Sequence, residues 1–214
     1  MTCKPTLLTL TTAIVLFTIH TERLEVLLAQ RESDCGLPGG GIEPNEDLDT
    51  AARRHLAEQT GWRDLYLEQL YTFSQPGCDP VHRVVTVAYY ALIPAEYLRT
   101  RALQPAGVHW VAVPELPSLR LDYGEIVALA HRRLAAKLAY STIALQLMPE
   151  RFTLSELQAV YETILGEPLD KRNFRKRVLA LDCIEATGER ARRGGYRPAQ
   201  LYRAKRPGQI DFIK

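Results

Sequence analysis

Apolar and polar positions follow different periods in two parts of the chain. In residues 1–138, runs rich in β-branched and aromatic residues predict β-strands, and these runs are TLTTAIVLFTI, LEVLLAQR, LYLEQLYTFS, VHRVVTVAYYALI and VHWVAV. Apolar residues at helical spacing predict helices at residues 47–59 and 123–138. Strands that come mostly in pairs, with two helices inserted, favour α+β layers over a doubly wound parallel sheet.

Residues 139–214 have mostly helical spacing and end in a pair of strand-like runs. Helices are predicted in YSTIALQLM, FTLSELQAVYETILG and DKRNFRKRVLAL, and strands in CIEAT and AQLYRA. Thr153 and Glu156 have the spacing of a capping box, and Gly166 stands where that helix should end. The expected order is three helices followed by a hairpin with the basic loop GERARRGGYRP.

The balance of charge differs between these two parts. Residues 1–138 hold 13 basic and 16 acidic side chains, a net charge of −3, whereas residues 139–214 hold 14 and 9, a net charge of +5. We therefore expect two domains, residues 1–138 and 139–214. An acidic sensing or catalytic domain would precede a domain that binds an anion.

The apolar run at residues 7–19 is too short for a helix that spans about 30 Å of hydrocarbon, and no small-residue cleavage site follows it. Its β-branched residues favour a buried strand, so we expect a cytoplasmic protein without a membrane segment. Cys3, Cys35, Cys78 and Cys183 form no C-x-x-C pair, which favours reduced thiols over a zinc site or disulfides. We expect no metal and no cofactor.

The segment from Gly40 to Trp62 resembles the signature of the Nudix hydrolases. The matching positions are Gly40, Glu46, Arg54, Leu56, Glu58, Gly61 and Trp62, and the preceding LPGGG is also typical of that family. The resemblance implies a Nudix fold, in which a mixed sheet lies between helices.

Two carboxylates of that signature are replaced, by His55 and Gln59. Positions 55, 58 and 59 share one face of a helix, where three carboxylates would hold magnesium ions that activate water on a diphosphate. Only Glu58 is kept, so we expect no catalytic residues and a pocket that binds a nucleotide diphosphate without cleaving it. A different metal held by His55, an active diphosphatase that uses Glu46 and Glu58, and a pocket without a role are the alternatives.

Several residues are candidates for the effector pocket. Glycines allow a phosphate close to backbone N–H groups, Arg54 can pair with a phosphate or orient Glu46 and Glu58, and two further arginines stand at strand ends. The expected effector-binding residues are Arg31, Gly39, Gly40, Arg54, Glu58 and Arg83. For Arg31 and Arg83, the sequence favours the alternative of a solvated surface arginine over a ligand role.

The basic part has the form of a DNA reader. In a helix that starts after Asp170, Phe174, Val178 and Leu181 face inward and cations face outward. Arginine pairs with guanine and asparagine with adenine in the major groove, and a basic hairpin after the helix is typical of a winged helix. The expected DNA-binding residues are Lys171, Arg172, Asn173, Arg175, Lys176, Arg192, Arg193 and Arg197. The alternative is a solvated charged face.

Both parts together resemble the Nudix-related transcriptional regulators of the NrtR family. The segments that carry this resemblance are LPGGG with AARRHLAEQTGW, YLEQLYTFSQPGCDPVHRVVTVAYYALIP, FTLSELQAVYETILGEPLDKRNFRKRVLAL and ERARRGGYRPAQLYR. The resemblance implies a homodimeric repressor of NAD biosynthesis and salvage genes. ADP-ribose or a related nucleotide would release it from a palindromic operator in double-stranded DNA. A regulator of sugar catabolism, particularly of arabinose, is the alternative within the family.

Overall fold

The computed structural model describes residues 8–31, 34–76, 83–100, 107–119, 122–191 and 198–213. The chain divides into two compact units, one drawn from residues 1–17, 25–92 and 102–130, and the other from residues 18–24, 93–101 and 131–214. The elements in chain order are β1 (Leu8–His20), β2 (Arg23–Arg31), β3 (Asp34–Gly36), β4 (Gly39–Gly41), α1 (Leu48–Thr60), β5 (Tyr66–Phe73), β6 (Arg83–Leu92), α2 (Glu96–Thr100), β7 (Val108–Ala112), the 3₁₀ turn η1 (Val113–Glu115), α3 (Tyr123–Lys137), the 3₁₀ turn η2 (Ile143–Leu147), α4 (Leu154–Leu165), α5 (Lys171–Ala180), β8 (Ile184–Ala191) and β9 (Ala199–Ala204).

The first unit is built on a mixed sheet. Its main path runs β3-β2-β1-β6-β5, while β4 pairs with β1 and β7 pairs with β2. The pair β1–β6 is parallel, and the pairs of β1 with β4, of β2 with β3 and β7, and of β5 with β6 are antiparallel. The α+β prediction is therefore confirmed, and the five strand-like runs are all strands. The three-residue strands β3 and β4 and the helix α2 were not predicted.

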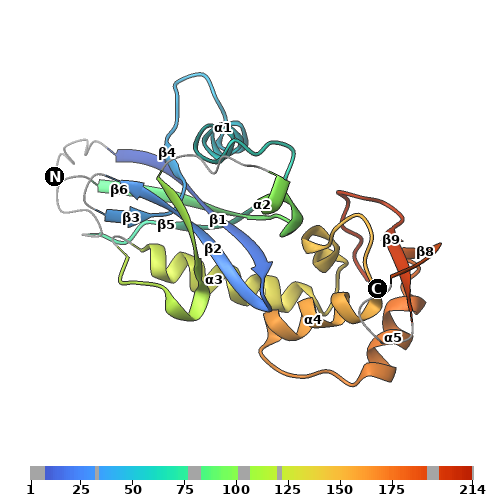
Figure 1. Cartoon of the computed structure of the whole chain (residues 1–214). Helices are drawn as coiled ribbons and strands as arrows, with labels where there is room; N and C mark the ends of the chain where they lie inside the picture. Colours follow the sequence, from blue (N-terminus) through green and yellow to red (C-terminus); the bar gives the residue numbers. More distant parts are fainter. Residues whose placement is uncertain are drawn as a thin grey trace. The chain divides into compact units, whose positions relative to one another are not determined.

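The core of the first unit forms because β1 is covered on both faces. All five residues from Ala13 to Phe17 are buried, which is typical of a strand between two layers rather than one with a wet face. Figure 1 shows α1 on one side of the sheet and the start of α3 on the other. Both helices contribute small or aliphatic side chains to these layers, namely Ala51, Ala52, Leu56, Ile126, Val127 and Ala130.

The strand β4 lies unusually close to β1. Gly39 has φ +146°, and a Cβ atom placed there would lie 2.1 Å from the carbonyl oxygen of Thr12. The neighbouring pairings of Thr12 with Gly40 and of Ala13 with Gly39 place this glycine strand beside β1, antiparallel to it. Glycine is therefore required at position 39, since only a residue without a side chain has both this φ and this space.

The second unit contains the predicted helix, helix and hairpin. α4 has the predicted capping box between Thr153 and Glu156, and Gly166 ends the helix in the left-handed conformation. Asp170 caps α5 by accepting a hydrogen bond from the amide of Asn173. The run YSTIALQLM was predicted as a helix, but it forms only the 3₁₀ turn η2, which ends at a Met148 with extended backbone.

The hairpin of β8 and β9 is longer than predicted. β8 continues to Ala191 and so includes the start of the expected loop. Gly188 was assigned to the hairpin turn, but it lies within β8 with φ +80°, where the register with β9 shifts between Ala186 and Arg190. Such an irregularity is a β-bulge, and a glycine with positive φ is a usual way to form one.

Replacing Gly39 with alanine should destabilise the protein. The new methyl group would force a positive φ on a residue with a side chain and collide with the Thr12 carbonyl, at a combined cost of roughly 2–4 kcal/mol. Gly41→Ala is the matched control, because a Cβ at position 41 meets nothing within 4 Å. Chemical denaturation measures both variants, and equal stabilities would show that the contact between β4 and β1 is not tight.

Candidate ligand site and DNA interface

The helix α1 is held at its start by two side-chain bonds. Asp47 caps the helix by accepting a hydrogen bond of 2.7 Å from the amide of Thr50. In the first turn, the hydroxyl of Tyr89 on β6 donates a hydrogen bond of 2.6 Å to Asp49. Burial is the main cause that raises the pKa of Tyr89, so its hydroxyl stays protonated as a donor. These contacts fix the rotation of α1 on the sheet, and hence which side chains face β4.

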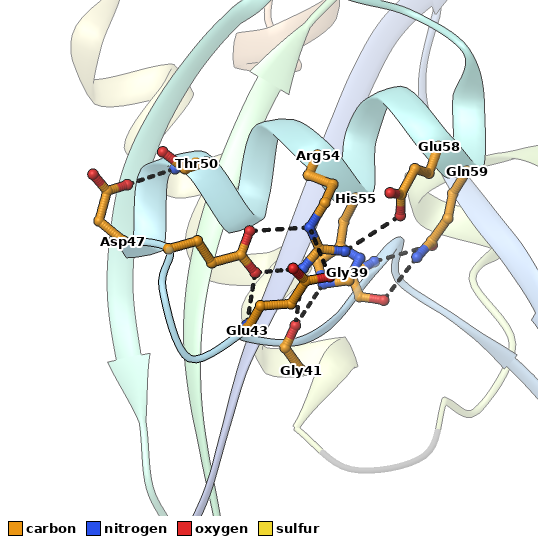
Figure 2. Close-up of polar contacts among 10 residues, drawn as sticks. Gly39, Gly41, Glu43, Asp47, Thr50, Arg54, His55, Glu58 and Gln59 are labelled. Carbon is orange, nitrogen blue, oxygen red and sulfur yellow. Dashed lines mark hydrogen bonds and ion pairs between the residues drawn. The ribbon is translucent and has the colours of Figure 1, made fainter.

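The two substituted signature residues both bind the backbone of β4 (Figure 2). Gln59 makes two hydrogen bonds with one residue: its Oε1 accepts from the Gly39 N–H at 3.1 Å, and its Nε2 donates to the Gly39 carbonyl at 2.9 Å. His55 is 8% exposed, and its Nε2 lies 2.9 Å from the carbonyl oxygen of Gly41, so this nitrogen carries the proton. An amide and an imidazole thus bind α1 to the glycine strand.

These residues do not fit the magnesium cluster that the signature implies. A carboxylate cannot donate to the carbonyls of Gly39 and Gly41, whereas an amide and an imidazole can. Glu58 keeps its carboxylate, but 58% of its side chain is exposed and it is paired with Arg54. Within the described part of the chain, no three His, Cys, Asp or Glu side chains gather closely enough to hold a metal ion.

Arg54 is the centre of an ion-pair network. Its guanidinium donates through Nε to Glu46 at 3.0 Å, through Nη2 to the same carboxylate, and through Nη1 to Glu58 at 3.3 Å. A weaker bond of 3.4 Å reaches the Gly41 carbonyl. The hydrogen bonds from Arg54 are the main cause that lowers the pKa of Glu46 to about 2, and the same pair raises the pKa of Arg54. Of the two expected roles of Arg54, this geometry favours orienting Glu46 and Glu58.

The remaining effector candidates lie in different settings. The N–H of Gly39 is bonded to Gln59, and a Cβ at Gly40 would lie 2.7 Å from the His55 ring, so both glycines are in direct contact with α1. Arg83 begins β6, and its Nη1 is buried with no hydrogen-bond partner among the described residues. A buried guanidinium nitrogen without a partner favours a ligand role. The Arg31 side chain lies outside what the structure describes.

The thiols agree with the prediction where they are described. Cys35 is half-buried, Cys183 is buried, and both are free, while Cys3 and Cys78 lie outside the described residues. None of the helices in the described residues has both the length and the apolar composition needed to cross a membrane.

In the second unit, α5 turns one face to the core and the other to solvent. Phe174 and Val178 are buried, and the Phe174 ring meets Tyr161 of α4 edge-on at 5.1 Å. The other side exposes every DNA-binding candidate that was predicted on this helix, namely Lys171, Arg172, Asn173, Arg175 and Lys176. The wing candidates Arg192, Arg193 and Arg197 lie outside the described residues.

The cations of α5 differ from other cations of the same unit. Several cations outside α5 form ion pairs, namely Arg151 with Glu189, Arg203 with Glu185, Lys205 with Asp182 and Arg206 with Asp211. Within the described ranges, Lys171, Arg172, Arg175 and Lys176 have no acidic partner. Like charges at spacing i,i+4 cost roughly 0.2–0.5 kcal/mol per pair, and a helix N-terminus disfavours cations. This arrangement is unfavourable unless a polyanion binds.

A groove of about 650 Å³ adjoins this face. It lies among the first residues of α4, the start of α5 and β9, and it contains Lys171 and Arg175. Its other lining side chains include Ser155, Gln200 and Tyr202. Sequence analysis did not single out these three residues, because they come from two separate segments, α4 and β9, and none stands in a run of charge.

Comparison with known proteins agrees with both units. Residues 8–131 match the NUDIX domain family, and residues 144–204 match the NrtR DNA-binding winged helix domain. The ADPR-responsive transcriptional repressor of Acinetobacter baylyi is 36% identical over 203 residues, which cover 91% of this chain and 81% of that protein.

Two solved structures from Shewanella oneidensis are also similar. NrtR complexed with a 27mer DNA has a TM-score of 0.84 and 36% identity, over 92% of this chain and 93% of that one. The NUDIX domain of NrtR complexed with ADP ribose has a TM-score of 0.52 and 35% identity, over 62% of this chain and 90% of that one.

The fold and these matches define a Nudix domain followed by a winged-helix DNA-binding domain. The sequence identity of 36% to the Acinetobacter baylyi repressor, over 91% of this chain, identifies the family within this class. The chain belongs to the NrtR family, as the sequence resemblance implied.

Removing the guanidinium of Arg54 should change how stability depends on pH. The folded Glu46 has a pKa of about 2 against an ordinary value of 4.5, so its ionised form stabilises the fold above pH 4.5 and this contribution is lost as pH falls towards 2. In Arg54→Gln the folded pKa should rise towards 4.5. The melting temperature should therefore be lower than that of the wild type at pH 7, and the difference should narrow towards pH 2.

Thermal denaturation between pH 2.5 and 7 provides the measurement. Arg53→Gln, a change at the adjacent exposed arginine, is the control and should shift the melting temperature little at any pH. A gap between wild type and Arg54→Gln that stays constant over this range would contradict the assignment of the Glu46 pKa to Arg54.

Replacing Arg175 with alanine should weaken DNA binding. Loss of one phosphate contact lowers the slope of log affinity against log salt by about 0.9, and loss of a base contact costs about 1–3 kcal/mol. Fluorescence anisotropy with a duplex selected by the wild-type chain from a random pool measures both quantities. Arg206→Ala removes one paired cation from the same unit and should leave the slope unchanged. Equal slopes together with equal affinities for wild type and Arg175→Ala would contradict a DNA contact by Arg175.

Proposed function

We propose that this protein is a transcriptional repressor that binds operator DNA through α5 and is released by ADP-ribose or a related nucleotide diphosphate. The observation that carries the proposal is the row of four cations on α5 that lack acidic partners in the described chain, in a unit that matches a DNA-binding family. Genes of NAD biosynthesis and salvage are the proposed targets, and regulation of sugar catabolism is the alternative.

The effector assignment has two supports. The Acinetobacter baylyi relative is described as ADPR-responsive, and a related NUDIX domain was solved with ADP ribose. In this chain, the buried Nη1 of Arg83 has no described partner and suits an anionic ligand such as a diphosphate. We include Arg31, Gly39, Gly40, Arg54 and Glu58 in the same proposed site, with Arg54 and Glu58 acting through the loop that they brace.

We further propose that the Nudix domain does not cleave its ligand. His55 and Gln59 are engaged with the β4 backbone by hydrogen bonds that need a donor, and Glu58 alone cannot provide the charge that a magnesium cluster requires. The similar proteins named above are regulators, which supports this assignment at the level of class.

The proposed operator binding also implies an oligomeric state and a cellular location for the protein. We propose a homodimer on a palindromic operator, because two-fold protein symmetry matches half-sites spaced by about 34 Å or its multiples. A repressor of this kind acts where bacterial DNA lies, so we propose a cytoplasmic location. The basic wing residues Arg192, Arg193 and Arg197 are proposed to contact the backbone or minor groove.

A release assay tests this function directly. ADP-ribose titrated onto the complex of full-length protein and selected duplex should lower DNA affinity by about 5–150-fold, the usual range of coupling. Incubation of the same protein with ADP-ribose and Mg²⁺ should yield no AMP at ordinary enzyme rates of about 1–10³ s⁻¹. Arg83→Gln should retain DNA binding and lose the response.

The outcomes separate the alternatives. Production of AMP at such a rate would identify a diphosphatase. Release by arabinose or a sugar phosphate, and not by ADP-ribose, would identify a regulator of sugar use. DNA binding that responds to none of these metabolites would contradict the effector proposal, and lack of DNA binding would contradict the function as a whole.

A further inference from the structure

We propose that Arg177 is a positioning residue that fixes the recognition helix α5 to the end of α3, and that this bond carries the effector response to the DNA-binding face. The inference rests on the proposed function and deepens it. Arg177 directly follows the solvent-facing cations of α5 and is itself exposed, yet its guanidinium donates hydrogen bonds to the protein backbone.

The contacts of Arg177 are specific. Its Nη2 donates to the carbonyl oxygens of Leu138 at 3.1 Å and Ala139 at 2.7 Å. These two residues directly follow α3, and the last carbonyls of a helix have no partner within the helix. A guanidinium at this end also lies at the negative pole of the helix dipole. The bond therefore satisfies the end of one helix with a side chain from another.

A second bond joins α3 to the other helix of the pair. Nε2 of His131 on α3 lies 2.9 Å from the carbonyl of Ile164, in the last turn of α4. Because a carbonyl only accepts, the imidazole donates through Nε2. α3 thus contacts α4 through His131, while α5 contacts the end of α3 through Arg177. Hydrogen bonds thus attach both helices of the DNA-binding pair, α4 and α5, to α3.

α3 also has a close contact at its other end. Its first residues belong to the unit that contains β3 and β4, and its residues from His131 onward belong to the DNA-binding unit. In the first unit, a Cβ placed on Gly36 would lie 2.8 Å from the ring of Tyr123, the first residue of α3. Gly36 ends β3, three residues before the glycine strand that Gln59 and His55 bind.

α3 is one continuous helix of 15 residues that includes residues of both units. In this proposal, a displacement of its first turn is passed along its backbone hydrogen bonds to its last turn. A ligand that shifts the glycine strand would therefore displace the start of α3 through Gly36 and Tyr123. The end of α3 would then carry α5 with it through Arg177. Thermodynamic linkage requires that ADP-ribose make different contacts in the DNA-bound and the DNA-free conformation of the protein.

The experiment compares Arg177→Ala, Arg177→Lys and wild type as full-length proteins. Three quantities are measured: ADP-ribose affinity without DNA by calorimetry, affinity for the selected duplex and for a random duplex, and the response factor. The response factor is the ratio of duplex affinities without and with saturating ADP-ribose. Arg206→Ala is the matched control, since it removes one cation of the same unit that is paired with Asp211.

Arg177→Ala should bind ADP-ribose as the wild type does. Its response factor should fall to a third of the wild-type value or less, and its discrimination between selected and random duplex should fall by about tenfold. Arg177→Lys, which keeps one donor, should be intermediate, and Arg206→Ala should keep the wild-type factor. Arg177→Ala with wild-type response and discrimination would overturn the proposal, as would equal loss in Arg206→Ala.

A second pair of variants keeps the proposal testable if Arg177→Ala does not fold. Gly36→Ala should displace Tyr123 and lower the response factor, whereas Gly124→Ala, with nothing within 4 Å of the new methyl group, should not. Equal response factors in these two variants would contradict the role of α3. If the wild type itself shows no response to ADP-ribose, the proposed function fails, and the loss of duplex discrimination in Arg177→Lys still decides the positioning role.

Discussion

The structure of the Nudix unit depends on the hydrogen bonds between α1 and the glycine strand β4. A strand of three glycines makes no side-chain contacts, and glycine loses more conformational entropy on folding than other residues do. It is held because its backbone pairs with β1 on one side and with Gln59 and His55 on the other. Two carboxylates at these positions would repel the same carbonyls without a metal between them. The replacement of the two carboxylates by His55 and Gln59 therefore removes the metal-binding charges and, at the same time, stabilises the glycine strand without a metal.

The same change explains how a hydrolase fold can serve as a receptor. An enzyme of this kind needs carboxylates that face a substrate and its metal ions. Here the corresponding positions face the protein, and the only kept carboxylate balances an arginine that braces the loop. The elements that shape the site thus remain, while His55 and Gln59 stand at the positions of two metal-binding carboxylates and hold α1 to β4. In the function proposed above, a ligand acts by changing contacts and is not consumed.

Much of this architecture was predictable because local chemistry and global fold agree. Thr153, Gly166 and Asp170 mark helix ends by their own hydrogen bonds, and the runs of β1 and β6 have several buried β-branched residues. The sequence did not reveal η2, since YSTIALQLM has the apolar spacing of a helix. In the structure, residues 141 and 142 instead form backbone and side-chain hydrogen bonds with the segment that contains Asp211 and Phe212. Arg177 was also missed, because it stands among exposed cations and only tertiary contacts distinguish it.

The charge on α5 has a consequence for the free protein in a cell. Its cations have no internal acids to satisfy them within the described chain, so any duplex offers them counter-charges. A bacterial genome presents about 10⁶–10⁹ such weak sites. The released molecule would therefore spend its time sliding on chromosomal DNA and not diffusing through the cytosol. An effector in such a system redistributes the protein along the chromosome, and the speed of renewed repression is set by a one-dimensional search.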